Sequence, residues 1–255
     1  MSIAIDLAGS MALVTGASQG MGAEIARMLH RAGARVVINH PDLGEGKTRA
    51  DAESLVNELL ALRADSAIAQ AADVRNPAAV HEMMQNIRQY WGELDILVNN
   101  AGILRQRSIA KMSLDDWRDV LDIDLSGVFF CCKYGLEILR DRGSIVCVGS
   151  LAARVGFHGQ SSYAAAKAGV ESLVRVLGLE CARRGIRVNA VAPGFINTSM
   201  IADASAALRE QFTKSLALGR LGEPGEVAAA VLFLSSPLAS YITRHVLAVD
   251  GGFLG

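Results

Sequence analysis

Tyr163 and Lys167 are the side chains of this 255-residue chain whose types and spacing best suit acid–base chemistry. Residues four positions apart share one face of a helix, which places the lysine ammonium beside the phenol. A phenol keeps its proton near neutral pH, and a nearby positive charge favours the phenolate form. The pair therefore fits proton transfer to or from a substrate oxygen. The alternative is an ordinary helix with one exposed tyrosine and one snorkelling lysine.

A glycine-rich turn with the sequence TGASQGMG occupies residues 15–22. It follows the short apolar run 12–14 and precedes an Ala-rich segment, 21–32, that predicts a helix. Such glycines permit a tight turn and close approach of the backbone to a pyrophosphate, while the helix N-terminus offers free N–H groups to phosphates. The alternative is that these glycines merely end a strand.

The elements that position these residues alternate between strand and helix along the chain. Strands are predicted at 12–14, 35–38, 67–71, 96–98, 144–148, 187–191 and 246–249. Helices are predicted at 21–32, 48–63, 78–90, 117–139, 163–183 and 226–235. Because parallel strands need crossover connections, we expect a Rossmann-type α/β fold: a doubly wound parallel sheet with helices on both faces, in one domain covering residues 1–255.

One connection, about residues 194–221, is longer than is typical of a compact domain, and we expect it to be a substrate loop. Together with residues 151–160 it would form the substrate pocket. The walls predicted there are mixed polar and apolar, from Arg154, Phe157, His158, Phe195 and Met200. Phe195 and Met200 are at least as plausible as packing residues.

Several motifs occur in one order along nearly the whole chain: TGxxxGxG at 15–22, Asp73-Val74, Asn99-Asn100-Ala101-Gly102, Ser150, Tyr163-Ala-Ala-Ala-Lys167 and Pro193-Gly194. In this pattern the chain resembles the short-chain dehydrogenase/reductase family, and is similar to its 3-oxoacyl-ACP reductase-like members. The resemblance implies hydride transfer between a secondary alcohol or ketone and a nicotinamide coenzyme, with Tyr163 as general acid/base. Ser150 would orient the substrate oxygen, and Lys167 would also hydrogen-bond the nicotinamide ribose.

The same resemblance implies a set of coenzyme-binding residues. Asp73 would contact the adenine, with Val74 packed beside it, and Pro193 and Gly194 would lie near the nicotinamide. The full expected set is Gly16, Ser18, Gln19, Gly20, Met21, Gly22, Asn39, His40, Asp73, Val74, Asn100, Ala101, Gly102, Tyr163, Lys167, Pro193, Gly194, Ile196 and Thr198.

Asp124 stands where most members of the family carry an asparagine, within Ile-Asp-Leu-Ser-Gly instead of a pattern like N-L-x-G. In the family this residue helps to form a kink in the proton path beside the lysine. We expect Asp124 to keep that relay position as a fourth catalytic residue, and a buried carboxylate there alters the electrostatics of Lys167. The alternative is a helix residue without influence on catalysis.

The coenzyme is expected to be NADP or NAD, with a preference for NADP. NAD users of the family usually carry an acid at the end of the second strand, where this chain has Asn39 and His40. NADP users often have a basic residue where this chain has Gln19. Lys47 and Arg49 can reach a 2′-phosphate if the preceding loop folds back, and otherwise they are solvated surface charges.

Composition limits the other partners. The formal net charge is −1, without the basic clusters of a nucleic-acid surface. No secretory signal or bilayer-spanning apolar stretch is evident, and the five histidines lack metal-ligand spacing. The four cysteines show no CxxC pairing, which favours buried, reduced thiols. We expect a cytoplasmic protein with no metal, no nucleic acid and no membrane partner, acting on a small carbonyl or alcohol compound.

The family resemblance further implies a homotetramer, with the helices around 124–139 and 163–183 forming one interface and the C-terminal strand another. The alternative function is a catalytically weak nicotinamide-binding sensor or scaffold of the same fold. An epimerase or dehydratase is a third possibility, but the chain length and the TGxxxGxG spacing argue against it. A hydrolase is disfavoured, because Ser161 and Ser162 lie outside any G-x-S-x-G turn and helix N-capping explains a serine just before Tyr163.

Overall fold

Seven parallel strands form the centre of the molecule. The computed structural model describes residues 4–41, 46–198, 210 and 212–253. The strands lie in the order β3-β2-β1-β4-β5-β6-β7, and every neighbouring pair is parallel. They are β1 (Met11–Val14), β2 (Arg35–His40), β3 (Ala67–Ala71), β4 (Leu94–Asn99), β5 (Leu139–Val148), β6 (Arg187–Pro193) and β7 (Val246–Val249). The predicted Rossmann-type doubly wound sheet is confirmed.

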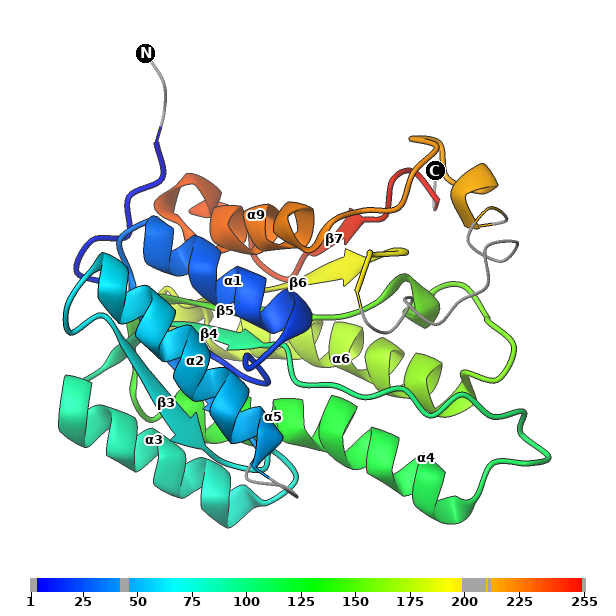
Figure 1. The fold of residues 1–255 in the computed structure, drawn as a ribbon, viewed down its shortest axis with the longest axis horizontal. Coiled ribbons are helices and arrows are strands. Elements are labelled where there is room, and N and C mark those ends of the chain that lie inside the picture. The colour runs from blue at the N-terminus through cyan, green and yellow to red at the C-terminus, as the bar shows by residue number, and fades with distance from the viewer. Residues whose placement is uncertain (1–3, 42–45, 199–209, 211, 254–255) are drawn as a thin grey trace.

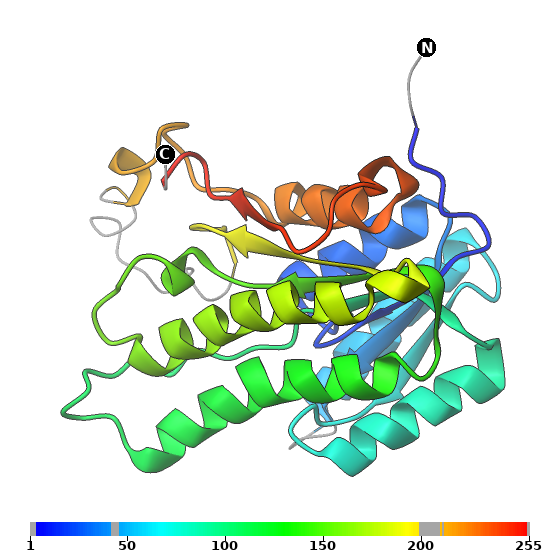
Figure 2. The ribbon, with the colours of Figure 1, turned by 180° about the vertical axis from the view of Figure 1, so that it is seen from behind.

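Helices cover both faces of this sheet (Figures 1 and 2). One layer consists of α1 (Gly20–Arg31), α2 (Lys47–Leu62) and α9 (Pro224–Ser235). The other consists of α3 (Pro77–Trp91), α5 (Gly127–Gly135) and α6 (Ser161–Glu180), with α4 (Leu114–Leu121) packed against α6. Every residue of β1 and β6 is buried, as expected for strands covered on both sides.

The helix predicted at 117–139 is wrong in its extent. It consists of α4, a π-helical turn over Asp122–Ser126, and α5, which ends at Gly135. Strand β5 then starts at Leu139, five residues before the predicted start. Its first half carries the exposed charges of residues 140–142 and shifts register against β4, so it shows no apolar pattern that the sequence could reveal.

The capping role predicted for a serine before Tyr163 is also wrong. Helix α6 begins at Ser161 itself, and Gln160 occupies the N-cap position without a side-chain capping bond. The Ser161 hydroxyl faces the Met112 sulfur at 3.7 Å. Ser162 is fully buried, and its hydroxyl has no hydrogen-bond partner in the part of the chain that the structure describes.

The strand order places the expected ligand-binding position at one edge of the sheet. All strands are parallel, so the segments that follow them gather at the same edge. Strand β1 pairs with β2 on one side and with β4 on the other, so the strand order reverses there. Ligands of open α/β sheets bind at this type of switch point. The turn at 15–22, which follows β1, lies at this position.

Candidate active site

The glycines of the turn after β1 are needed for its shape. Gly16 and Gly20 both have φ of +59°, which favours glycine. A Cβ atom on Gly22 would lie 2.4 Å from Asn100 Nδ2 and 2.5 Å from the Gly16 carbonyl oxygen. Helix α1 begins at Gly20, so its free N–H groups lie at the turn. The turn thus has the shape and the free N–H groups that phosphate binding requires, and binding of a coenzyme phosphate there stays a prediction.

Thr15 and Asn100 fix this turn to the end of β4. The Thr15 hydroxyl oxygen accepts hydrogen bonds from the backbone N–H groups of Asn100 at 3.0 Å and Ala101 at 3.1 Å. The Asn100 amide donates in return to the carbonyl oxygens of Thr15 and Gly16, at 2.9 and 3.0 Å. Thr15 was absent from the predicted site. The feature of the sequence that could have revealed it is a hydroxyl residue between a buried strand and the first glycine of the turn.

Asn39 ties the same turn to β2 and β3. Its side-chain oxygen accepts from the Gly16 N–H at 3.2 Å, and its amide nitrogen donates to the carbonyl oxygens of Gln70 at 3.2 Å and Ala72 at 3.0 Å. The side chain is completely buried, so it holds the turn from the protein interior. The neighbouring His40 is also buried, with Nδ1 3.2 Å from the Pro41 carbonyl oxygen. Their contact with a coenzyme stays a prediction.

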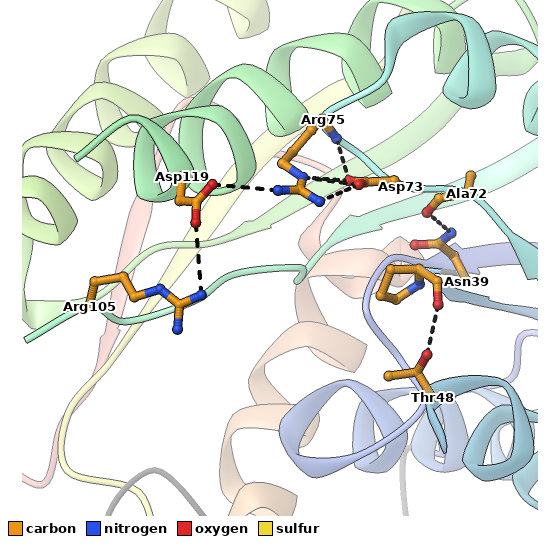
Figure 3. Close-up of polar contacts among 8 residues, drawn as sticks. Asn39, Thr48, Ala72, Asp73, Arg75, Arg105 and Asp119 are labelled. Atoms are coloured by element: carbon orange, nitrogen blue, oxygen red, sulfur yellow. Dashed lines mark hydrogen bonds and ion pairs between the residues drawn. The ribbon is translucent and has the colours of Figure 1, made fainter. Parts of the chain in front are cut away.

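The predicted adenine residue Asp73 carries an ion pair that the sequence did not reveal (Figure 3). Its carboxylate accepts from the Arg75 guanidinium at 2.7 Å and from the Arg75 N–H at 3.0 Å. Burial alone would raise the pKa of Asp73, but these hydrogen bonds and the charge of Arg75 hold that pKa below its usual value. Asp119 on α4 bridges Arg75 and Arg105, at 3.5 and 3.9 Å.

The start of α2 is anchored beside the end of β2. The Thr48 hydroxyl donates to the Pro41 carbonyl oxygen at 2.7 Å (Figure 3), and Gly46 before the helix has φ of +74°. Lys47 is exposed at the first position of α2. Arg49 is exposed and pairs with Glu53 at 3.0 Å. The chain therefore returns to the strand end, as a 2′-phosphate contact by Lys47 or Arg49 would require.

The remaining residues of the turn differ in exposure. Gln19 is exposed just before α1 and makes no side-chain capping bond. Ser18 is half-buried, and Met21 is half-buried against the core between α1 and the sheet. Val74 is buried and lies against Gly127 at the start of α5. These positions fit the predicted set, whose coenzyme contacts stay predictions.

Tyr163 and Lys167 lie one turn apart in α6, as predicted. The Lys167 ammonium is 5.5 Å from the centre of the Tyr163 ring, and it donates to the Val148 carbonyl oxygen of β5 at 3.0 Å. Lys167 is almost completely buried, whereas Tyr163 is half-buried. Ser150 follows β5 two residues after Val148, and its hydroxyl accepts from the Ala152 N–H at 3.1 Å. The fold thus brings the end of β5, which Ser150 follows, to Lys167.

Asp124 lies in the π-helical turn and faces Lys167 from the other side. Its Oδ2 is 3.2 Å from the Lys167 ammonium, and its Oδ1 accepts from the Ile103 N–H at 2.8 Å. The predicted kink and the predicted proximity to the lysine are both present. A Cβ atom on Gly102 would lie 2.8 Å from Oδ2, so glycine leaves room for the carboxylate.

The ionisation of this buried pair is coupled. Burial is the largest influence on Asp124 and raises the pKa of its carboxyl, although the charge of Lys167 and the hydrogen bond from Ile103 oppose the rise. Burial alone would lower the pKa of Lys167, but the charge of Asp124 reverses this and raises that pKa above its ordinary value. The lysine is therefore held in its charged form.

The substrate side begins at the end of β6. Gly194 donates its N–H to the Val249 carbonyl oxygen at 3.0 Å, and a Cβ atom there would lie 2.7 Å from Asp250 Cα. Ile196 is buried, and the Thr198 hydroxyl lies 3.4 Å from the Ile196 carbonyl oxygen. Within the predicted loop of 194–221, residues 199–209 and 211 lie outside the described residues, Met200 among them.

Four phenylalanine rings from separate segments meet on this side. Phe195 stacks on Phe212 of the loop, with ring centres 4.1 Å apart and 13° between the planes. Phe157, between Ser150 and Tyr163 in sequence, meets Phe195 edge-on at 5.6 Å. Phe253 near the C-terminus lies 5.5 Å from Phe195 and 6.2 Å from Phe157. Two of these rings, Phe157 and Phe195, were among the predicted pocket walls.

Metal-ligand clusters and membrane-spanning helices are absent from the described part of the chain. Residues 4–41, 46–198, 210 and 212–253 contain no group of three or more His, Cys, Asp or Glu side chains that could hold a metal ion. None of the helices described in those ranges is both long and apolar enough to cross a membrane. The four cysteines are buried and form no disulfide.

The chain is similar to known proteins over nearly its full length. A family model described as Enoyl-(Acyl carrier protein) reductase matches residues 16–254. The chain is 40% identical over 251 residues to a 3-oxoacyl-(acyl-carrier-protein) reductase of Synechocystis sp., covering 97% of this chain and 98% of the relative. It is 40% identical over 253 residues to 3-oxoacyl-(acyl-carrier-protein) reductase FabG of Vibrio cholerae, with coverage of 97% and 98%.

The fold is similarly close to a solved structure. A crystal structure of a blue fluorescent protein from a metagenomic library, in complex with NADPH, superposes with a TM-score of 0.92 at 34% identity. The superposition covers 98% of this chain and 100% of that chain.

Proposed function

The chain belongs to the short-chain dehydrogenase/reductase family of nicotinamide-dependent oxidoreductases, and we propose that Tyr163 moves the proton in its reaction. The reaction is the interconversion of a secondary alcohol and a ketone. One observation carries the assignment: the buried Lys167 ammonium contacts the end of the Ser150 strand and faces the Tyr163 ring one helical turn away. The turn at 15–22 supports a coenzyme site there, because its close packing leaves no room for a side chain on Gly22 beside Asn100 and the Gly16 carbonyl oxygen.

When bound, the nicotinamide coenzyme supplies or accepts the hydride at the substrate carbon. In reduction, the Tyr163 hydroxyl gives its proton to the substrate oxygen, so that the carbonyl gains one hydride and one proton. The Ser150 hydroxyl hydrogen-bonds the same oxygen and orients it. The Lys167 charge stabilises the phenolate that remains on Tyr163. In alcohol oxidation the same groups act in reverse, and we propose Asp124 beside Lys167 as the fourth member of this set.

We propose NADP as the preferred coenzyme. Its adenine end would lie against Asp73, Val74 and the segment Asn100–Gly102, with the nicotinamide near Pro193, Gly194, Ile196 and Thr198. The Asn39 amide is already occupied by backbone groups, which disfavours its use as a direct ribose ligand. Exposed Lys47 at the start of α2 supplies a positive charge suited to a 2′-phosphate.

The coenzyme proposal has a direct test. Replacing Lys47 by alanine should weaken NADPH binding severalfold, because the 2′-phosphate loses a positively charged partner. Binding of NADH, which has no 2′-phosphate, should stay unchanged. Lys133→Ala on α5 is the matched control, which should change neither. A wild-type protein that uses NADH at least as efficiently as NADPH contradicts the preference.

The substrate is proposed to be a compound with a ketone or secondary alcohol, such as a 3-oxoacyl thioester, a ketoester, a polyol or a cyclic ketone. The names of the Synechocystis and Vibrio relatives support the 3-oxoacyl class. The assignment of the loop of about 194–221 to the substrate side is supported by its Phe212, which packs on Phe195 directly after Pro193-Gly194.

Assembly into a homotetramer is proposed from exposed apolar side chains on the predicted interface helices: Phe129 on α5, and Val176 and Leu179 on α6. Sedimentation analysis should give the mass of four chains, and a monomer refutes the proposal. A cytoplasmic location is supported by the buried, unpaired cysteines, and a small-molecule partner without nucleic acid by the net charge of −1.

Turnover tests the central proposal. Loss or gain of reduced-coenzyme absorbance should be followed with a panel of ketones and alcohols for the wild type, Tyr163→Phe and Ser150→Ala. We expect the wild type to turn over at least one compound and Tyr163→Phe to lose roughly 10²- to 10⁴-fold of that rate. Coenzyme binding without turnover over a broad panel would instead favour the sensor or scaffold function.

A further inference from the structure

Lys167 is enclosed by groups from three elements. The Val148 carbonyl oxygen and the Cys147 thiol come from β5, Tyr163 comes from α6 itself, and Asp124 comes from the π-helical turn. Lys167 and Asp124 have side-chain exposures of 3% and 0%. Solvent and salt therefore screen the pair only weakly, and the two charges act on each other at close range.

The Asp124 carboxylate is held in one orientation. The Ile103 N–H fixes its Oδ1, and the absence of a side chain on Gly102 leaves space for Oδ2. Oδ2 has no aligned hydrogen bond within the described residues, although it lies 3.2 Å from the Lys167 ammonium. Oδ2 therefore faces the lysine ammonium with no other hydrogen-bond donor among the described residues.

We propose that Asp124 is a positioning residue that compensates the charge of Lys167, keeps Tyr163 in its proton-donating form and so biases the enzyme toward carbonyl reduction. This inference rests on the proposed function. It goes beyond a place for Asp124 in the proton path, because it states how aspartate in the usual asparagine position changes the reaction. An unpaired ammonium would favour the phenolate, whereas a neutral pair favours it much less.

The size of the effect follows from distance. Asp124 Oδ2 lies 3.2 Å from the Lys167 ammonium, which lies 5.5 Å from the centre of the Tyr163 ring. At an effective dielectric constant near 20, a unit charge roughly 8 Å from a titrating group shifts its proton equilibrium by roughly one to two pH units. Asparagine has the same shape as aspartate and keeps an oxygen for the Ile103 N–H, so Asp124→Asn removes the charge with little structural change. The charge of Lys167 then acts on Tyr163 alone.

The test is the pH dependence of kcat/KM for alcohol oxidation and carbonyl reduction. We expect Asp124→Asn to raise oxidation near neutral pH about tenfold and to move its rise with pH downward by roughly one to two units. The loss of reductase activity at high pH should move in the same direction. Asp122→Asn is the matched control, because Asp122 lies in the same turn with an exposed side chain. Unchanged profiles in Asp124→Asn overturn the proposal.

A second readout needs no substrate. Phenolate absorbance is titrated with pH in the wild type and in Asp124→Asn. The Tyr163→Phe version of each of these two proteins is titrated in the same way. Subtracting its curve isolates the signal of Tyr163 from that of the other three tyrosines. The isolated signal should appear at lower pH in Asp124→Asn, and coincident titrations overturn the proposal. If no compound is turned over but the titrations separate, the proposed function fails while the charge compensation stands.

Discussion

The coenzyme side and the substrate side of the candidate site are built from different interactions. Thr15, Asn39 and Asn100 hold the phosphate turn through hydrogen bonds to backbone groups. On the substrate side the contacts are between aromatic rings. Phe195 contacts Phe157, Phe212 and Phe253. A phosphate cradle needs N–H groups in fixed positions, whereas apolar rings tolerate displacement. Substitutions on the two sides should therefore affect different steps.

The largest effect is expected from Gly22→Val. Its Cβ would overlap the Asn100 amide and the Gly16 carbonyl oxygen, at 2.4 and 2.5 Å, and both hold the turn in shape. Coenzyme affinity, measured by fluorescence titration, should fall at least about 100-fold. Gly225→Ala, at an open position in α9, is the control and should bind coenzyme normally. Normal binding by Gly22→Val would show that the turn does not hold the pyrophosphate.

Asn39→Ala should have the next largest effect, and on stability as well as binding. It leaves the Gly16 N–H and the Ala72 carbonyl oxygen without their buried partner. Denaturant unfolding should show a loss of about 1–3 kcal/mol, with weaker coenzyme binding. The exposed Asn57 of α2 offers a control, for which Asn57→Ala should stay within about 0.5 kcal/mol of the wild type. Equal effects of the two variants would remove Asn39 from the support of the turn.

Phe195→Ala should act on the substrate and spare the coenzyme. The variant loses ring contacts with three partners, each worth about 0.5–1.5 kcal/mol beyond burial. We expect KM for the substrate to rise about tenfold while the dissociation constant for NADPH changes less than about twofold. A parallel loss of coenzyme affinity would mean that the two sides are not separate.

The smallest effect concerns acid stability at the C-terminal end of α1, the end away from the phosphate turn. His30 of α1 is buried, with Nε2 2.7 Å from the Ser66 hydroxyl, and burial followed by the charge of Arg63 lowers its pKa. In the unfolded chain His30 has its ordinary pKa near 6.5, so at lower pH the unfolded chain binds a proton more readily than the folded protein does. The contribution of neutral His30 to stability is therefore present above pH 6.5 and is lost as pH falls. His30→Gln should flatten the decline in unfolding free energy between pH 7 and 5. His158→Gln, at an exposed position, should leave it unchanged.

The sequence was most informative where a residue type has few alternatives. Buried parallel strands need continuous apolar runs, and glycines in a turn between strand and helix have a geometric reason, so the doubly wound parallel sheet and the tight turn after its first strand could be predicted. Lys167 lies beside Tyr163 because helical spacing requires it. The Asp124 position could also be predicted, because the flanking pattern was intact.

Side-chain orientation could not be predicted in the same way. The hydrogen bonds of the Asn39 side chain to backbone groups of Gly16, Gln70 and Ala72 could not be predicted, because these groups come together only when β1, β2 and β3 are in place. Arg75 is a surface charge by composition, and only the fold brings it to Asp119 of α4. The four phenylalanines come from segments up to almost 100 residues apart, so no local pattern could join them.

The most direct test of the account is a single-turnover measurement of NADPH absorbance with a ketone substrate, comparing the wild type with Tyr163→Phe at saturating coenzyme. The account predicts equal NADPH binding in both proteins and a hydride-transfer rate lower by roughly 10²- to 10⁴-fold in the variant. A variant that binds NADPH equally well and retains more than about a tenth of the wild-type rate would contradict the assignment of Tyr163 as the proton donor.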